Sequence, residues 1–209
     1  MAINDRLVAV GGGSNVIPLE TDGTIAGNSD KLVPTQKAVK TYVDKPVASS
    51  MAPGAGFAGT GTVYKASVNK VGDLITTTIF IDLTGAASST TDLDIIGTSG
   101  VSHIGQIVAA VNGTIIGGKM TCLELPAGGA DDIDFYSATE GTGAFDGGIA
   151  ALAETALVTA GGAWASGTTK GLIANPAANS YLYLTGGEAG TAATYTAGQF
   201  LIELYGVAA

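Results

Sequence analysis

Three aspartates near the middle of the chain have the clearest capacity for chemistry. Asp131, Asp132 and Asp134 lie within one short stretch, and a further carboxylate could come from Glu140 or Asp146. Carboxylate oxygens suit Ca²⁺, but this spacing differs from that of a known loop such as the EF-hand. A solvated turn that leads into a strand explains the aspartates better. The sequence therefore predicts no bound metal and no cofactor, with these aspartates as the best metal candidate.

The single histidine, His103, is a weak candidate for catalysis. A catalytic triad needs a nucleophile and an acid that converge on the histidine. Ser102 adjoins His103 in the sequence, but neighbours along a strand point to opposite faces of the sheet. No Gly-x-Ser-x-Gly motif occurs in the chain. We therefore predict a structural histidine with its polar atoms satisfied, and a protein that is not an enzyme.

The stretch GTIIGGKM, residues 113–120, comes close to a phosphate-binding P-loop. Its glycines and Lys119 have the required spacing, but Met120 replaces the Ser or Thr that should reach Mg²⁺. A P-loop also needs a following helix. Asn112-Gly113 stands between two apolar runs and is typical of a type I′ turn. We therefore predict a β-hairpin at this turn.

The chain has one cysteine, Cys122, in the apolar run GKMTCLELP. One cysteine forms no intrachain disulfide, and it excludes a zinc site built on cysteine pairs. We predict that Cys122 is buried and acts as a small hydrophobic side chain.

The charge balance excludes several kinds of partner. The chain has 9 Lys and Arg against 18 Asp and Glu, a net charge of −9. A nucleic-acid-binding protein needs a basic patch, and anionic membranes also attract basic segments. No apolar run reaches the roughly 18 residues of a membrane span. We therefore expect a soluble protein that binds neither nucleic acid nor membranes.

Charged residues make up only 13% of the chain, and the mean hydropathy is +0.37. Permanent protein interfaces are depleted in charge in the same way. This composition indicates that copies of the chain or another protein cover much of its surface. The alternative is a monomer with a surface rich in Ser, Thr and Gly.

From Val63 onward the apolar residues alternate with period two, which favours strands. Residues 72–85 show it best, because Ile75, Ile79 and Ile81 fall on one face. The segments 131–138, 180–186 and 194–207 continue the pattern, and 149–162 reads as strand or mixed structure. We predict a mainly β protein with an antiparallel β-sandwich or jelly roll over residues 63–209.

The first 62 residues predict three different parts. Residues 1–28 are rich in glycine and predict an extended arm, which could pair as strands only with a partner. Residues 29–45 predict a short helix with Pro34 in its first turn. Such a helix is marginal alone and must pack on something. Residues 46–62 are rich in Gly, Ala, Ser and Pro and predict a linker.

The helical segment resembles one that recurs in bacteriophage proteins. The stretch NSDKLVPTQKAVKTYVD is similar to a segment of phage tail-fibre and head-fibre proteins, where it is a short helix at a three-fold junction. The resemblance implies a homotrimer that meets through Val39, Tyr42 and Val43. The C-terminal half is similar to the distal domains of phage decoration and head-fibre proteins. The run AGQFLIELYG is similar to the last strand of trimeric C1q/TNF-like jelly rolls.

Together these observations predict a bacteriophage virion structural protein. We expect a trimeric capsid decoration protein, a cement or head-fibre protein, on the exterior of the phage particle. Its partners would be its own copies and the major capsid protein of the head. The alternative is a tail-fibre or spike receptor-binding protein that binds a host glycan or receptor. The arm would anchor the protein through its apolar residues Ile3, Leu7, Val8, Val10, Val16, Ile17 and Leu19.

Overall fold

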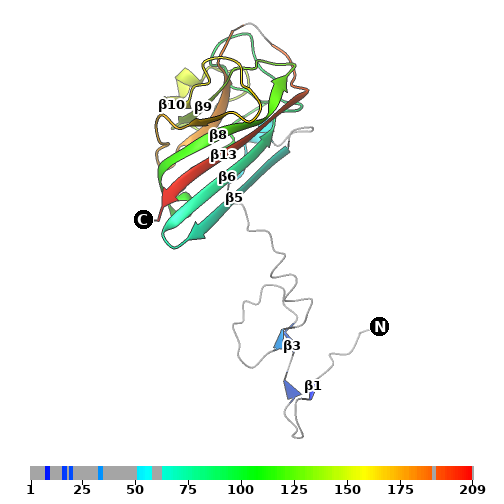
Figure 1. Ribbon diagram of the computed structural model, residues 1–209, viewed down its shortest axis with the longest axis vertical. Helices are drawn as coiled ribbons and strands as arrows, with labels where there is room; N and C mark the ends of the chain where they lie inside the picture. The colour runs from blue at the N-terminus through cyan, green and yellow to red at the C-terminus, as the bar shows by residue number, and fades with distance from the viewer. Residues whose placement is uncertain are drawn as a thin grey trace, which may run out of the picture. The chain divides into compact units, whose positions relative to one another are not determined.

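The chain divides into two compact units, Met1–Ala48 and Ser49–Ala209. The computed structural model describes residues 51–57, 63–189 and 192–208, together with the backbone of four two-residue strands in the first unit. Figure 1 labels some of the strands of each unit. Each unit is considered by itself.

The four strands of the first unit pair within the chain itself. Strand β1 (Val8–Ala9) is antiparallel to β2 (Val16–Ile17), and β3 (Leu19–Glu20) is parallel to β4 (Val33–Pro34). The expectation that the arm pairs only with a partner is therefore wrong at these strands. Pro34, predicted in the first turn of the helix over residues 29–45, instead lies in the strand β4. Apart from β4, the predicted helix lies outside the described residues.

The second unit is a sandwich of two antiparallel sheets (Figure 1). The five-stranded sheet has the order β11-β8-β13-β6-β5, and the four-stranded sheet has the order β10-β9-β12-β7. The predicted mainly β fold with an antiparallel sandwich is confirmed. The strands of the five-stranded sheet are β5 (Val63–Val71), β6 (Leu74–Asp82), β8 (Thr114–Ala127), β11 (Thr169–Gly171) and β13 (Ala197–Val207). Those of the four-stranded sheet are β7 (Gly105–Gln106), β9 (Ile133–Ala138), β10 (Glu154–Val158) and β12 (Tyr181–Gly186).

Strands β6 and β13 show why the alternating sequence forms this sheet. In β6, Ile75, Thr77, Ile79 and Ile81 are buried, while the alternate residues Thr76, Thr78 and Phe80 are half-buried. Phe200 and Ile202 of β13 point to the same core. Alternate side chains of a strand lie on opposite faces, so one apolar face packs inward and the other remains open. The strands predicted at 72–85 and 194–207 are confirmed.

The four-stranded sheet differs, because it is covered on both faces. Phe135 of β9 and Leu182 of β12 join the main core between the sheets. Their neighbours Tyr136 and Tyr183 join a second buried cluster with Leu152 of the short helix η2 (Ile149–Leu152). All six residues of β9 are buried, including the polar Asp134 and Ser137, as expected for a strand that is covered on both faces. The segment 149–162 holds η2 and β10, as the mixed prediction allowed.

The hairpin predicted at Asn112-Gly113 is wrong. Asn112 ends a single helical turn, α2 (Ala109–Asn112), and β8 then pairs with β13 and β11. The Asn112 side chain is fully buried. Its Nδ2 donates to Thr77 Oγ1 at 2.9 Å, and its Oδ1 accepts from the Val108 backbone N–H at 2.8 Å. Tertiary hydrogen bonds of a buried side chain thus replace the expected surface turn.

Part of the predicted linker belongs to the sandwich. Met51 and Phe57, the latter in the short helix η1 (Ala55–Phe57), are buried in the main core. The Gly54 N–H donates to the His103 carbonyl at 2.8 Å, and the Gly56 N–H donates to the Val101 carbonyl at 2.7 Å. The second unit therefore begins near Ser49 rather than at Val63.

Candidate functional site

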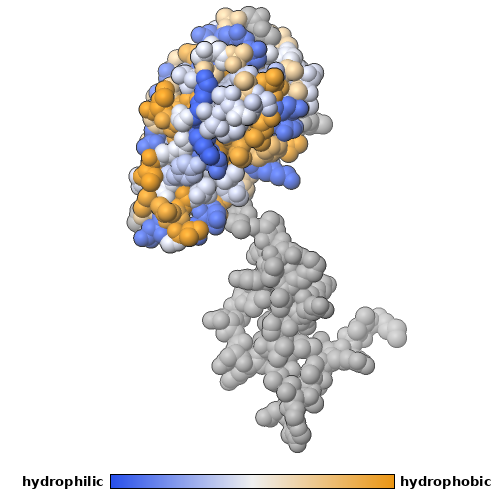
Figure 2. Space-filling model, viewed as in Figure 1, coloured by the Kyte–Doolittle hydropathy of each residue, from blue (hydrophilic) through white to orange (hydrophobic). Residues whose placement is uncertain are grey.

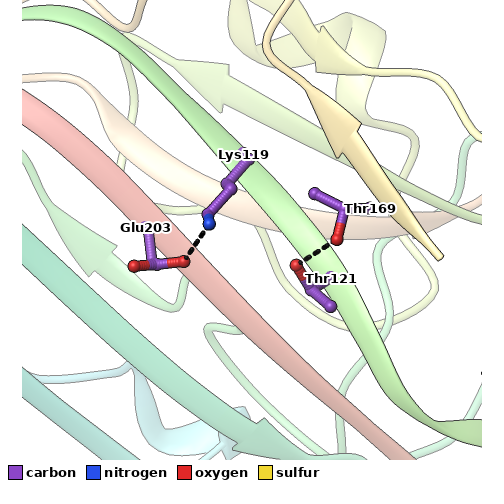
Figure 3. A network of polar contacts seen from close by, with 4 residues as sticks. All are labelled: Lys119, Thr121, Thr169 and Glu203. Atoms are coloured by element: carbon purple, nitrogen blue, oxygen red, sulfur yellow. Dashed lines mark hydrogen bonds and ion pairs between the residues drawn. The ribbon is translucent and has the colours of Figure 1, made fainter. Parts of the chain in front are cut away.

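The outer face of the five-stranded sheet is the open surface that the fold presents. A polar band runs over β13, β8 and β11 on this face (Figure 3). Lys119 Nζ of β8 lies 2.9 Å from Glu203 Oε2 of β13, and the hydroxyls of Thr121 and Thr169 lie 2.8 Å apart. The Glu203 carboxylate raises the pKa of the Lys119 ammonium through a hydrogen bond and its charge. The two charges offset each other, so the band is close to neutral.

An apolar patch lies at one end of the same face. Strand register places Val71 beside Leu74 and Leu74 beside Val207. Ile116 is the extra residue of a bulge next to Tyr205, because Tyr205 pairs with Gly117 and Gly206 pairs with Ile115. Val71 and Leu74 are 71% and 62% exposed. Figure 2 shows hydrophobic residues near the β5–β6 turn. The apolar patch consists of Val71, Leu74, Ile116, Tyr205 and Val207.

Strand β5 forms one edge of the sheet and pairs only with β6 among the described strands. The loop between them is Gly72-Asp73, and Gly72 has φ +62°, which suits a two-residue hairpin loop. Such a loop closes on a hydrogen-bonded pair, here Val71 and Leu74, and the bonds then recur at every second residue. The backbone N–H and C=O groups of Tyr64, Ala66, Val68 and Lys70 therefore point away from β6.

Of the three aspartates predicted to lie in a solvated turn, Asp131 is exposed, but Asp132 and Asp134 are buried. Asp132 and Asp134 are each only 6% exposed. Asp134 Oδ1 accepts from the Ala160 N–H at 2.6 Å, and Asp132 Oδ2 accepts from the Gly162 N–H at 2.7 Å. The two carboxylates thus hold the loop that follows β10. In the part of the chain that the structure describes, no group of three His, Cys, Asp or Glu side chains could hold a metal ion.

Burial raises the pKa of Asp134, and the hydrogen bond from Ala160 opposes this rise. The nearby charges of Asp132 and Asp92 raise the pKa further, while Lys170 lowers it. Lys170 Nζ itself donates to the Ala160 carbonyl and lies 5.3 Å from the centre of the Trp164 ring. The aspartates, the lysine and the tryptophan therefore brace one loop.

His103 has a structural position, but its polar atoms are not all satisfied as predicted. Its ring centroid lies 5.0 Å from that of Tyr181 and 6.3 Å from that of Tyr183. Its Nδ1 is buried without a hydrogen-bond partner among the described residues. Burial lowers the pKa of the imidazole. The neighbouring Ser102 Oγ donates to the Gly100 carbonyl at 3.0 Å, so the two side chains form no catalytic pair.

Two other sequence predictions concern β8. Cys122 is fully buried, as predicted, and its Sγ donates to the Glu124 carbonyl at 3.2 Å. Burial raises the pKa of its thiol, which keeps it in the less reactive protonated form. Residues 114–120 run within β8 rather than into a helix. The backbone therefore lacks the strand–loop–helix arrangement that a P-loop requires.

The residues predicted to anchor and trimerise the protein are not described at the level of side chains. Val39, Tyr42 and Val43 lie outside the described residues. The backbone pairs Val8 with Ile17 and Leu19 with Val33. The predicted anchoring residues are Ile3, Leu7, Val8, Val10, Val16, Ile17 and Leu19, and their roles stay predictions.

The sequence alone did not predict the apolar patch or the free edge, which is the side of β5 that faces away from β6 and pairs with no described strand. The segment VYKASVNKV, residues 63–71, alternates as a strand should, and this signal was available. Its place at the edge, however, depends on β13 pairing with both β6 and β8 across long stretches of sequence. Local patterns do not report such long-range pairing.

Among the described residues, no helix has both the length and the apolar character needed to cross a membrane. No protein-family model, curated protein or solved structure matches this chain. The case for function therefore depends on the residues and on the fold.

Proposed function

We propose that this protein is a virion structural protein of a bacteriophage, a homotrimer that decorates the outside of the head. The observation that carries the proposal is the resemblance of residues 28–44 to a segment of phage fibre proteins, together with the location of that segment in a separate unit. The chain divides after Ala48, so the phage-like segment and the sandwich fall in different compact units. An attachment unit joined to a display unit needs this division.

The sandwich supports a role in display rather than in catalysis. Its open face carries a nearly neutral polar band and an apolar patch. Asp132 and Asp134 brace a loop, His103 packs beside two tyrosine rings, and Cys122 is buried in the core. With 13% charged residues in the chain, such a surface suits permanent contact with protein.

The proposed mechanism is attachment by mass action. An arm that binds the assembled shell, and not the isolated capsid subunit, stabilises the shell in proportion to its occupancy. A trimer presents three arms, so the second and third bind at a high effective concentration. Because ordering an arm costs conformational entropy, we expect attachment only on a preformed surface.

The test uses phage heads that lack this protein. Full-length protein and a variant without residues 1–45 are added to the heads, and bound protein is measured after sedimentation. We expect the full-length protein to bind and to raise the temperature at which the heads release DNA. The truncated variant should stay in the supernatant. Equal binding of both proteins would overturn the anchoring role of the arm.

Deletion of the gene from the phage separates the head role from a tail role. A decoration protein predicts that phage lacking it adsorb normally to cells and have fragile heads. Poor adsorption with heads of normal stability would instead favour a tail-fibre or spike receptor-binding protein. Cryo-electron microscopy of both particles would locate the missing density.

A further inference from the structure

The sequence of β5 is nearly self-complementary. When two copies of the strand run antiparallel with Ser67 opposite Ser67, Lys65 of one copy lies opposite Asn69 of the other, and Val63 lies opposite Val71. Among the residues whose side chains lie on the inner face of the sheet, Ala66 lies opposite Val68 and Tyr64 lies opposite Lys70. Two copies of this strand, antiparallel and centred on Ser67, therefore align along all nine residues of β5.

This alignment also satisfies the backbone. The outward-pointing N–H and C=O groups belong to Tyr64, Ala66, Val68 and Lys70, as the β5–β6 loop requires. In the alignment centred on Ser67, Tyr64 lies opposite Lys70 and Ala66 lies opposite Val68. Each residue whose backbone N–H and C=O point away from β6 therefore faces another such residue, and the two can exchange hydrogen bonds. An alignment shifted to centre on Lys65 would pair fewer residues and place two lysines directly opposite each other, which is unfavourable.

The side chains at the seam also fit a second copy. Lys65 would meet an amide rather than another cation, and Lys70 would meet the tyrosine ring. Val63 and Val71 are 41% and 71% exposed, and pairing would place the second copy's Val63 beside Val71. Val207, Leu74 and Val71 of the apolar patch lie in one row across three strands. That row would then continue through Val63 of the second copy onto its five-stranded sheet.

We propose that the free edge of β5 pairs with β5 of a second copy of this chain about a two-fold axis, which joins two five-stranded sheets into one. Exposed strand edges commonly recruit another chain in this way. Lysines on an edge can also discourage pairing, but in this alignment neither lysine faces another. The proposal goes beyond the virion role and does not rest on it. In a trimer, a two-fold contact of this kind would join separate trimers.

Cysteine cross-linking of the full-length chain tests the proposed register. Ser67 would face Ser67 of the second copy at a non-hydrogen-bonded position, with the Cα atoms about 4.5 Å apart. That distance lies within the range of a disulfide. We expect Ser67→Cys to give a covalent dimer on mild oxidation, seen on a non-reducing gel. The native Cys122 is fully buried and is retained in every variant.

Asn69→Cys is the matched control, since it lies on the same strand and face. In the proposed register, the Cα atoms of the two introduced cysteines would be about 14 Å apart, which is too far for a disulfide. The double variant Lys65→Cys/Asn69→Cys should cross-link again, because these positions face each other. Equal cross-linking of the Ser67→Cys and Asn69→Cys variants, or none with Ser67→Cys, would overturn the proposal.

Proline substitution tests the contact without a cross-link. Ala66→Pro removes an outward N–H that makes no bond to β6, and proline is tolerated in edge strands. Sedimentation velocity of the full-length protein over a range of concentrations should show the two-fold association weakened at least about tenfold. Lys65→Ala keeps every backbone group and serves as the control. An Ala66→Pro protein with unchanged thermal unfolding and unchanged association would contradict the proposal.

Discussion

At the scale of single residues, two buried titratable groups give the sandwich opposite responses to pH. Burial raises the pKa of Asp134, so the folded protein holds a proton there more tightly than the unfolded chain does. Burial lowers the pKa of His103, so the folded protein holds that proton less tightly. Stability rises with pH only where the unfolded chain binds more protons. The two side chains therefore act in opposite directions.

Asp134→Asn should remove one of these responses. In the native protein, the contribution of Asp134 is fully present below the unfolded pKa and is lost as pH rises through the folded pKa. Asparagine keeps an oxygen for the Ala160 N–H and carries no charge. We expect the gain in the free energy of unfolding over the native protein to grow from pH 4 to pH 7, measured by urea denaturation.

Asp134→Leu is the control for that change. It removes the charge but also leaves the Ala160 N–H without its acceptor, which costs roughly 1–3 kcal/mol. If the asparagine and leucine variants have the same free energy of unfolding at pH 7, the hydrogen bond to Ala160 contributes nothing.

His103→Phe should remove the opposite response. The contribution of the neutral histidine is present above the unfolded pKa, about 6.5, and is lost as pH falls through the folded pKa. Phenylalanine keeps a ring beside Tyr181 and eliminates the buried, unpartnered Nδ1. Thermal unfolding between pH 7 and pH 5 should show a smaller fall in stability for the variant. A fall as steep as that of the native protein would contradict this assignment.

At the scale of elements, β13 and α2 lie in close contact because β13 has a glycine, Gly206, at the point of contact. A Cβ at Gly206 would collide with the Asn112 carbonyl oxygen, whereas a Cβ at Gly117 on the adjoining strand would meet no described atom within 4 Å. We expect Gly206→Ala to lower the free energy of unfolding by about 2 kcal/mol or more, since backbone must shift. Gly117→Ala should change it by less than about 0.5 kcal/mol. Chemical denaturation of both variants measures the difference.

The same contact explains which elements the sequence could predict. Strands β6 and β13 follow from their alternating residues, because one face of each is buried. Asn112-Gly113 has the composition of a surface turn, but Asn112 bonds to Thr77, which lies 35 positions earlier in the chain. The segment 51–57 looked like a linker because it is rich in Gly and Ala. Its two large apolar side chains, Met51 and Phe57, nevertheless enter the core.

At the scale of the whole molecule, the two sheets are unequal. Within the part of the chain that the structure describes, the four-stranded sheet is covered on both faces, and the five-stranded sheet on one. Because the chain has few charged residues, the sequence analysis predicted that copies of the chain or another protein cover much of its surface. It did not predict which face or edge would be open, because that depends on long-range strand order. The roles of the proposed anchoring and trimerisation residues stay predictions, because the fold of the sandwich does not test them.

Truncation should separate the two units. We expect removal of residues 1–48 to change the unfolding temperature of the sandwich by less than about 2 °C, because its described core lies in residues 51–208. Removal of residues 1–57 also deletes Met51 and Phe57, whose loss should lower that temperature by roughly 10 °C. The fluorescence of Trp164, the single tryptophan, reports on the transition. A large fall on removing residues 1–48 would show that the first unit supports the sandwich.

The central place of β13 has a consequence for synthesis of the protein. Strands β6 and β8 are joined in the sheet only through β13, which lies between them although it follows both in the chain. A nascent chain that has not reached residue 197 therefore presents two long strands with unsatisfied edges and an apolar face. Ribosome stalling or premature termination before that point should yield products that aggregate or are degraded, because the five-stranded sheet is complete only after β13 has been synthesised.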